Sequence, residues 1–255
     1  MSKLFDLSGK VAVITGASRG IGYSIAEQMA AVGARVVISS RNQGACDSAA
    51  QAIRDQGGEA LSLAAKISDH AQLQNLVDTT VANWGKVDIL VCNAAVNPYL
   101  GPMSGLTDEV FDRMMRSNVL SNLWLSGMVL PGMVERRDGT IIFISSIIGM
   151  KGTLTLGAYG ISKAADMALA RNLASENGKH NVRVNTIAPG LVKTDFARAL
   201  WENPEALHKR EAAIPLGRLA KPEEIAGIAV FLAAPAGAYL TGQTIVADGG
   251  FMLAP

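Results

Sequence analysis

A tyrosine and a lysine four residues apart are the first candidates for chemistry in this chain. Tyr159 and Lys163 lie in the segment GAYGISK, and in a helix they would project from one face, a single turn apart. A serine pair, Ser145 and Ser146, ends an apolar run thirteen to fourteen residues before Tyr159. A phenol, an ammonium group and a hydroxyl group that converge can move a proton on and off a carbonyl oxygen. Because Tyr-x-x-x-Lys also arises by chance in helices, the assignment depends on the rest of the chain.

The composition describes a protein that can bury a sizeable core. Of its 255 residues, 49% are hydrophobic and 18% are charged, and the formal net charge is +1. Lys and Arg form no cluster, so nucleic acid is not expected as a partner. Cys46 and Cys92 form no CxxC motif and fit a reducing compartment. His70, His180 and His208 lack metal-ligand spacing, so no metal is expected.

The hydropathy and the two ends of the chain give no sign of a membrane or of targeting. No stretch reaches the roughly 18 consecutive apolar residues of a membrane span. The first residues, MSKLFDLSGK, are too polar for a signal peptide, and the last ones, FMLAP, carry no address or lipidation signal. We therefore expect a soluble cytoplasmic protein.

A glycine-rich turn follows the first predicted strand. Residues 11–15 (VAVIT) are typical of a strand buried on both faces, and GASRGIG, with Gly16, Gly20 and Gly22, follows at once. An amphipathic helix comes next, and residues 34–39 predict a second strand. Glycines allow a tight turn with close backbone approach, and the N-terminus of a helix favours a pyrophosphate. This order predicts a dinucleotide site, the alternative being a merely tight turn.

The alternation of strands and helices continues to the end of the chain. Helices are predicted at 43–57, 69–84, 108–135 (bent near Pro131), 157–178 and from Pro222, and strands at 59–65, 87–92, 140–145, 182–187 and 244–247. Such alternation specifies a parallel sheet with helices on both faces. Since no linker or repeat is present, we predict one domain over residues 1–255, with a mobile, partly helical lid at about 195–211.

A series of motifs extends over nearly the whole chain, from about Leu7 to Gly250. They are Thr15-Gly16…Gly20-Ile21-Gly22, Asn93-Ala94-Ala95, Asn118, Ser146, Tyr159-x-x-x-Lys163 and Pro189-Gly190. With these motifs in this order, the chain resembles the classical short-chain dehydrogenase/reductases. The resemblance implies an α/β fold of doubly wound Rossmann type, with three α/β/α layers and a seven-stranded parallel sheet in the order 3-2-1-4-5-6-7. It also implies a cofactor across the carboxyl ends of the strands.

The resemblance assigns a role to each member of a catalytic tetrad. Tyr159 would be the general acid in ketone reduction and the general base in alcohol oxidation. Lys163 would lower the pKa of the phenol and hold the nicotinamide ribose. Ser146 would bond the substrate oxygen, and Asn118 would hold a water that links Lys163 to solvent. Ser145 is an alternative to Ser146, although the thirteen-residue offset from Tyr159 matches Ser146, and Asn118 could instead bridge a helix kink.

The resemblance also implies which residues hold the cofactor. They are Gly16, Ser18, Arg19, Gly20, Ile21, Gly22, Ser40, Arg41, Ile67, Asn93, Ala94, Lys163, Pro189, Gly190, Val192 and Thr194. The second strand ends without an acid for a ribose 2′-hydroxyl, and Arg19 and Arg41 can pair with a 2′-phosphate, so NADP(H) is expected rather than NAD(H). The alternative is that both arginines are only solvated surface charges. Lys66 stands where the family commonly has an Asp that meets the adenine, which leaves affinity at that end open.

The residues expected to line the substrate pocket are mostly apolar. They are Val96, Asn97, Tyr99, Ile148, Leu154, Leu156, Phe196 and Trp201. Such residues suit an apolar or aromatic carbonyl compound, although ordinary packing beneath a lid would have the same composition. The sequence thus predicts an NADP(H)-dependent oxidoreductase that interconverts a ketone or aldehyde and an alcohol. The expected partner is a small-molecule carbonyl or alcohol substrate, with no nucleic acid and no membrane, and the resemblance implies a homotetramer. A β-ketoacyl thioester reductase and a non-catalytic nucleotide-binding regulator are the alternatives.

Overall fold

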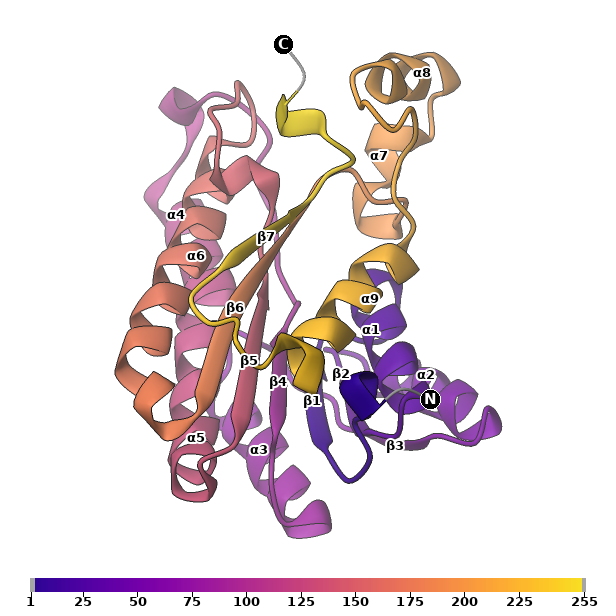
Figure 1. Cartoon of the computed structure of the whole chain (residues 1–255). Helices are drawn as coiled ribbons and strands as arrows, with labels where there is room; N and C mark the ends of the chain where they lie inside the picture. Colours follow the sequence, from indigo (N-terminus) through magenta and orange to yellow (C-terminus); the bar gives the residue numbers. More distant parts are fainter. Residues whose placement is uncertain (1–2, 254–255) are drawn as a thin grey trace.

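The core of the computed structural model is a parallel sheet of seven strands (Figure 1). The structure describes residues 3–253, except for the side chains at 199, 200 and 206. The strands are β1 (Val11–Thr15), β2 (Arg35–Ser39), β3 (Glu59–Ser62), β4 (Ile89–Cys92), β5 (Gly139–Ile144), β6 (Val182–Pro189) and β7 (Thr244–Ala247). Their order is β3-β2-β1-β4-β5-β6-β7, with every pair parallel, so the predicted topology is confirmed.

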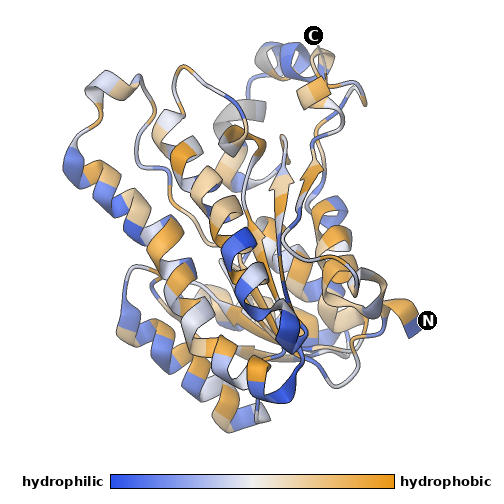
Figure 2. Ribbon diagram, turned by 60° about the vertical axis from the view of Figure 1, so that its left-hand side comes forward, coloured by the Kyte–Doolittle hydropathy of each residue, from blue (hydrophilic) through white to orange (hydrophobic). Residues whose placement is uncertain are grey.

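Helices cover both faces of this sheet. One layer holds α1 (Gly20–Ala31), α2 (Gln43–Asp55) and α9 (Pro222–Ala233), and the other holds α3 (His70–Trp84), α4 (Asp108–Met115), α5 (Ser121–Arg136) and α6 (Gly157–Asn177). Alternate strand residues serve the two layers: Ala12 and Ile14 pack toward α1, whereas Val13 packs toward α3. In Figure 2 the strands are accordingly hydrophobic, while hydrophilic residues lie along the helices.

The predicted helix over 108–135 is interrupted at a place that the sequence did not indicate. A π-helical turn over Arg116–Leu120 separates α4 from α5, whereas Pro131 lies inside α5. Such turns open the regular backbone bonding by one residue and are frequent at functional sites. The turn contains Asn118, which is fully buried. The side chain of Asn118 bonds to Val96 and Ser162 in other elements, and helical periodicity does not reveal such contacts.

The carboxyl ends of the strands all meet at one edge, because every strand runs in the same direction. The loop after β5, the start of α6 and the segment 189–195 leave from this edge. Two short helices, α7 (Arg198–Trp201) and α8 (Pro204–Ala212), fill the predicted insertion. In Figure 1 they lie at the same end of the molecule as the segment that follows β7. The partly helical character of residues 195–211 is therefore confirmed. Across residues 3–253, no helix is both long and apolar enough to cross a bilayer.

Candidate active site

The glycine-rich turn between β1 and α1 leaves no room for side chains. Gly16 has φ +65°, and a Cβ there would lie 2.8 Å from Nδ2 of Asn93. A Cβ at Gly22 would lie 2.5 Å from both this nitrogen and the Gly16 carbonyl oxygen. Asn93, directly after β4, holds the turn by donating to the carbonyls of Thr15 at 2.9 Å and Gly16 at 3.1 Å. The two central strands thus fix a backbone surface that a ligand can approach closely.

The N-terminus of α1 has the properties of a phosphate site. Gly20 begins this twelve-residue helix, and Arg19 at the N-cap position provides no side-chain cap. Uncapped N–H groups in the first turn and the helix dipole both favour an anion. The guanidinium of Arg19 is 71% exposed and lies 3.5 Å from the carboxylate of Asp195. These features fit the pyrophosphate of a dinucleotide.

The end of β2 carries the residues expected at the adenosine ribose. Ser40 is partly exposed, with its Oγ 3.1 Å from Sγ of Cys46. Arg41 is exposed and, within the described part of the chain, forms no ion pair. Ile67 is partly buried against the core on the α3 side of the sheet, and Lys66 is exposed. A cation and a small hydroxyl residue are therefore available at this position, as the sequence predicts.

The segment after β6 returns to the glycine-rich turn. A Cβ on Gly190 would lie 2.7 Å from Cα of Asp248, so only glycine fits. Val192 is buried and forms a parallel bridge to Ala220. Thr194 then reaches α1, since a Cβ on Gly20 would lie 3.4 Å from its Cγ2. The segment that begins at the end of β6 thus lies against the predicted phosphate site.

Helix α6 places Tyr159 and Lys163 on one face. Tyr159 is partly exposed, whereas Lys163 is only 2% exposed. The Nζ atom of Lys163 lies 5.7 Å from the centroid of the Tyr159 ring. It donates to the carbonyl of Ile144, the last residue of β5, at 2.8 Å and to Oδ2 of Asp166 at 3.1 Å. The ammonium therefore spans from the helix to the carboxyl end of the sheet.

The two serines after β5 have different surroundings. Ser145 is buried, and its hydroxyl donates to the carbonyl of Lys163 at 2.7 Å. Ser146 is partly exposed, and its Oγ accepts from the N–H of Ile148 at 3.2 Å, which leaves its hydrogen free to donate. The loop can lie directly on α6 because Gly149 has no side chain: a Cβ there would lie 2.8 Å from the Lys163 backbone. The arrangement favours Ser146 as the serine that meets a substrate.

Asn118 joins three parts of the site. Its Oδ1 accepts from the N–H of Val96 at 2.8 Å, and its Nδ2 donates to the carbonyl of Val96 at 2.9 Å and to Oγ of Ser162 at 3.1 Å. Ser162 in turn donates to the carbonyl of Tyr159 at 2.8 Å. Asn118 thus bridges the π-helical turn, the loop after β4 and α6. This geometry accounts for the interrupted helix, and the role of Asn118 in a relay to Lys163 stays a prediction.

A buried acid, which was not among the predicted site residues, lies beside the lysine. Asp166 is fully buried, and its Oδ1 accepts from Nδ2 of Asn122 at 2.9 Å while its Oδ2 accepts from Lys163. Asn122 also donates to the carbonyl of Asn118 at 2.7 Å. Helical spacing was a usable signal: Asp166 lies three residues after Lys163 and seven after Tyr159, so all three share one face. An acid on a face that packs against the sheet needs a partner.

The pKa values of Tyr159 and Lys163 both lie above the ordinary values of these groups. Burial raises the pKa of the Tyr159 phenol; the charge of Lys163 lowers it, and that of Asp166 raises it further. The lowering expected from Lys163 is therefore outweighed in the protein alone. Burial by itself would lower the pKa of Lys163, but Asp166 and then Tyr159 raise it above its ordinary value. At neutral pH a protonated phenol thus lies beside an ammonium group.

The residues expected to line a substrate pocket differ in their exposure and in their contacts with the site. The ring of Phe196 is 6.5 Å from that of Tyr159, centroid to centroid, and is 64% exposed. Trp201 donates from Nε1 to the carbonyl of Thr194 at 2.9 Å. This bond connects α7 to the segment that follows β6. Leu154 is 91% exposed. The partly exposed members are Val96, Asn97, Tyr99, Ile148, Leu156 and Trp201.

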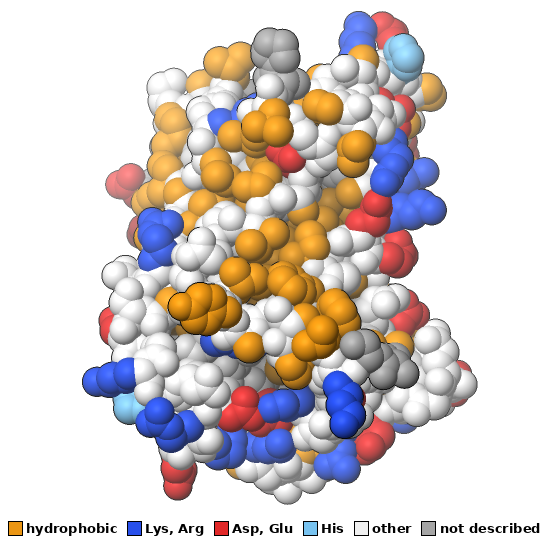
Figure 3. Space-filling view, in the orientation of Figure 1, with side chains coloured by type: hydrophobic (Ala, Val, Ile, Leu, Met, Phe, Trp, Pro, Cys, Tyr) orange, Lys and Arg blue, Asp and Glu red, His pale blue; other side chains and the backbone are white. Residues whose placement is uncertain are grey.

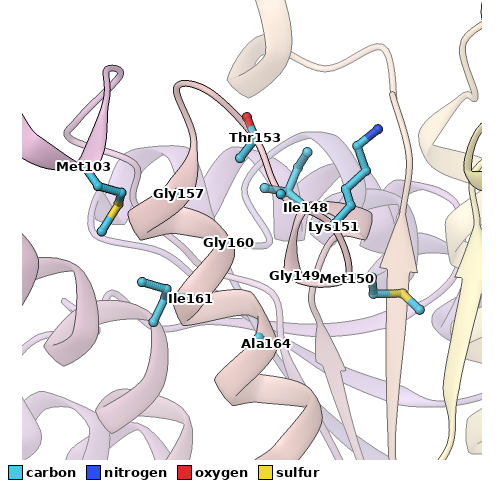
Figure 4. A pocket seen from close by; sticks show the side chains of 11 residues that line it. Met103, Ile148, Gly149, Met150, Lys151, Thr153, Gly157, Gly160, Ile161 and Ala164 are labelled. Carbon is cyan, nitrogen blue, oxygen red and sulfur yellow. The ribbon is translucent and has the colours of Figure 1, made fainter.

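A cavity of about 460 Å³ lies between α6 and the loop that follows β5 (Figure 4). Gly157, Gly160, Ile161 and Ala164 line it from the helix, together with Met103 and the loop 148–153. At 100° per residue these helix positions point away from the face of Tyr159 and Lys163. Of the residues predicted to line a substrate pocket, Ile148 lines this cavity.

Comparison with known proteins places the chain in a family. A family model described as Enoyl-(Acyl carrier protein) reductase matches residues 16–252. Dehydrogenase/reductase SDR family member 4 of Bos taurus is 39% identical over 250 residues, which cover 98% of this chain and 90% of the bovine protein. The chain therefore belongs to the short-chain dehydrogenase/reductase family. It is an oxidoreductase, which sets aside the alternative of a non-catalytic regulator.

Solved structures support the same assignment. A gluconate 5-dehydrogenase from Burkholderia cenocepacia in complex with NADP and tartrate is 31% identical, with a TM-score of 0.94 over 99% of each chain. A 7α-hydroxysteroid dehydrogenase complexed with NADH and 7-oxo glycochenodeoxycholic acid is 37% identical, with a TM-score of 0.94 over 98% of this chain and 97% of that one. Similar folds therefore hold either nicotinamide nucleotide and quite different substrates.

Replacing each serine separately tests which one meets the substrate. Ser146→Ala should lower kcat/KM for the carbonyl substrate by about 10²- to 10³-fold, because it removes a donor to the reacting oxygen. Ser145→Ala should retain turnover per folded molecule and lower the free energy of unfolding by about 1–2 kcal/mol, because it removes a buried hydrogen bond. Steady-state kinetics and urea unfolding measure the two effects. The reverse pattern would assign the reaction to Ser145.

Proposed function

We propose that the protein is an NADP(H)-dependent carbonyl reductase and alcohol dehydrogenase for apolar or aromatic substrates. The observation that carries the proposal is the protonated Tyr159 beside the buried ammonium of Lys163, at the sheet edge that also carries the glycine-rich turn. Proton transfer at a carbonyl oxygen is the chemistry that these groups can perform. Exposed Phe196 and partly exposed Trp201, both in the 195–211 segment, supply apolar surface for a substrate.

In the direction of reduction, the side chains of this chain manage the proton and the charge on oxygen. The hydroxyl of Ser146 donates a hydrogen bond to the carbonyl oxygen of the substrate and polarises it. The phenol of Tyr159 then gives its proton to that oxygen as an alkoxide develops, and Lys163 stabilises the resulting phenolate. A bound nicotinamide supplies the hydride. In oxidation the same phenol, once deprotonated, accepts the proton of the alcohol.

In this proposal the glycine-rich turn and α1 would hold the pyrophosphate, and Lys163 would bind the nicotinamide ribose. Preference for NADP(H) is supported by the end of β2, where Arg41 is exposed and unpaired among the described residues. A guanidinium matches a 2′-phosphate, whereas a 2′-hydroxyl gains more from an acid. We also propose that residues 195–211 close over the substrate and exclude water.

A substrate panel is the direct test of the proposed reaction. Wild-type protein should oxidise NADPH in the presence of aryl and alkyl ketones, followed by the loss of nicotinamide absorbance. Tyr159→Phe should lower kcat by at least about 10²-fold while nucleotide binding, followed by fluorescence, is retained. Because the family model is described as a reductase of acyl carrier protein substrates, carrier thioesters belong in the panel. Turnover of acetoacetyl thioesters far above that of ketones would favour the thioester alternative.

Arg41 allows the cofactor preference to be tested. Arg41→Ala should raise the KM for NADPH about 10- to 100-fold, since a charge-assisted bond to the phosphate is lost, and should change the KM for NADH about twofold or less. Arg171→Ala removes another exposed arginine, from α6, and serves as the control. A wild-type preference for NADH, or equal effects of Arg41→Ala on both nucleotides, would contradict the assignment.

We propose a homotetramer because two separate surfaces are apolar. Figure 3 shows hydrophobic side chains gathered across the middle of the face that carries β7 and α9. Exposed residues near β7 include Leu216, Tyr239 and Val246. The second surface lies around the cavity on α6, with exposed Met103 and Ile161. Two self-complementary contacts of different kind generate a tetramer with dihedral symmetry.

Light scattering combined with size-exclusion chromatography measures the mass of the assembly in solution. We expect a mass of four chains, each of 26.7 kDa. Val246→Lys would place a charge at the edge of β7 and should yield dimers, since only one of the two contacts is affected. A monomeric wild-type protein would refute the assembly.

A further inference from the structure

The buried acid next to the catalytic lysine has no part in the mechanism above. Asp166 is fully buried and lies one turn beyond Lys163 on α6, with Oδ2 3.1 Å from Nζ. Its other oxygen accepts from Asn122 of α5 at 2.9 Å. An unpaired charge at such a depth would be strongly unfavourable. The ammonium of Lys163 and the carboxylate of Asp166 therefore stabilise each other in the charged form.

The surroundings of this pair are otherwise uncharged. On α6 the neighbouring titratable group is Tyr159, whose pKa is raised. From β4 the thiol of Cys92 faces the pair, and burial raises its pKa so that it stays neutral. From β5 comes the carbonyl of Ile144, and from α5 the amide of Asn122. Among the described residues, the net charge near Tyr159 is thus set by Lys163 and Asp166.

We propose that Asp166 is a positioning residue of the reaction: its carboxylate holds the Lys163 ammonium at the end of β5 and offsets part of the charge that Lys163 exerts on the Tyr159 phenol. This inference rests on the proposed function of Tyr159 and Lys163. The carboxylate should keep the pKa of the Tyr159 phenol higher than Lys163 alone would allow. With the ammonium compensated, the phenol keeps its proton over a wider pH range, which is the state that carbonyl reduction requires.

The sign of the effect follows from the charge of the site. With Asp166 ionised, Tyr159–OH and Lys163–NH₃⁺ form a site of net charge zero. Asp166→Asn removes the negative charge and leaves the same two groups at net charge +1. A more positive site gives up its first proton at lower pH. The basic limb of carbonyl reduction and the acid limb of alcohol oxidation should therefore both move to lower pH.

The decisive measurement follows the phenol itself. In protein labelled with ¹³C at the tyrosine Cζ, the Tyr159 resonance, assigned with Tyr159→Phe, should titrate roughly one pH unit lower in Asp166→Asn than in the wild type. Asp166→Glu retains the charge and should restore the wild-type titration. Glu176→Gln removes an exposed acid near the end of the same helix and should have no effect. An unchanged Tyr159 titration in Asp166→Asn would overturn the proposal.

Two further measurements test the role of Asp166 independently of the Tyr159 titration. The profiles of kcat/KM against pH, recorded in both directions, should shift together with the phenol. Because the NMR titration needs no substrate, inactivity toward ketones would refute the proposed function without touching the inference on Asp166. If Asp166→Asn does not fold, the wild-type protein labelled at the aspartate carboxyl carbons gives the answer. The Asp166 resonance should be that of a carboxylate at pH 7, and the shift of a neutral carboxylic acid would overturn the proposal.

Discussion

The ammonium group of Lys163 inside the protein is the interaction on which the rest of the site depends. Its side chain is buried to within a few per cent, so burial must be offset by close partners. Those partners come from different elements: the carbonyl of Ile144 ends β5, and Asp166 follows on α6. Since Asn122 of α5 holds the far oxygen of Asp166, one charge ties the sheet to two helices. The position of the ammonium is therefore fixed before any ligand arrives.

The same requirement explains the small and polar residues around α6. The loop after β5 must approach the helix closely, and Gly149 permits this because a Cβ there would meet the Lys163 backbone at 2.8 Å. The hydroxyl of Ser145 then donates a hydrogen bond to the carbonyl of Lys163. On the other side, Asn118 and Ser162 satisfy each other and the neighbouring backbone. A buried polar network of this kind is favourable only when its members are paired, and these contacts provide the pairs.

Local patterns were enough to predict the strands and the turn at Gly16, because both depend on short-range spacing, whereas the order of the strands followed from the family resemblance. The π-helical turn at 116–120 could not be predicted in this way, since its cause is a bond from Asn118 to Val96, twenty-two residues earlier. The pairing of Asp166 with Asn122 spans forty-four residues and is equally invisible to periodicity. The spacing of Asp166 from Lys163, in contrast, was readable and was overlooked.

The charges at the two ends of the cofactor site act in different surroundings and therefore do different things. At the proposed nicotinamide end, Lys163 and Asp166 are buried, so water and salt screen them little and a single unit of charge would change the protonation of Tyr159. At the adenosine end, Arg41 is exposed and screened, so the discrimination between nucleotides that we propose for it would not affect the chemistry. Selectivity for the cofactor and tuning of the proton donor are thus separable in this fold, and a substitution at one end need not disturb the other.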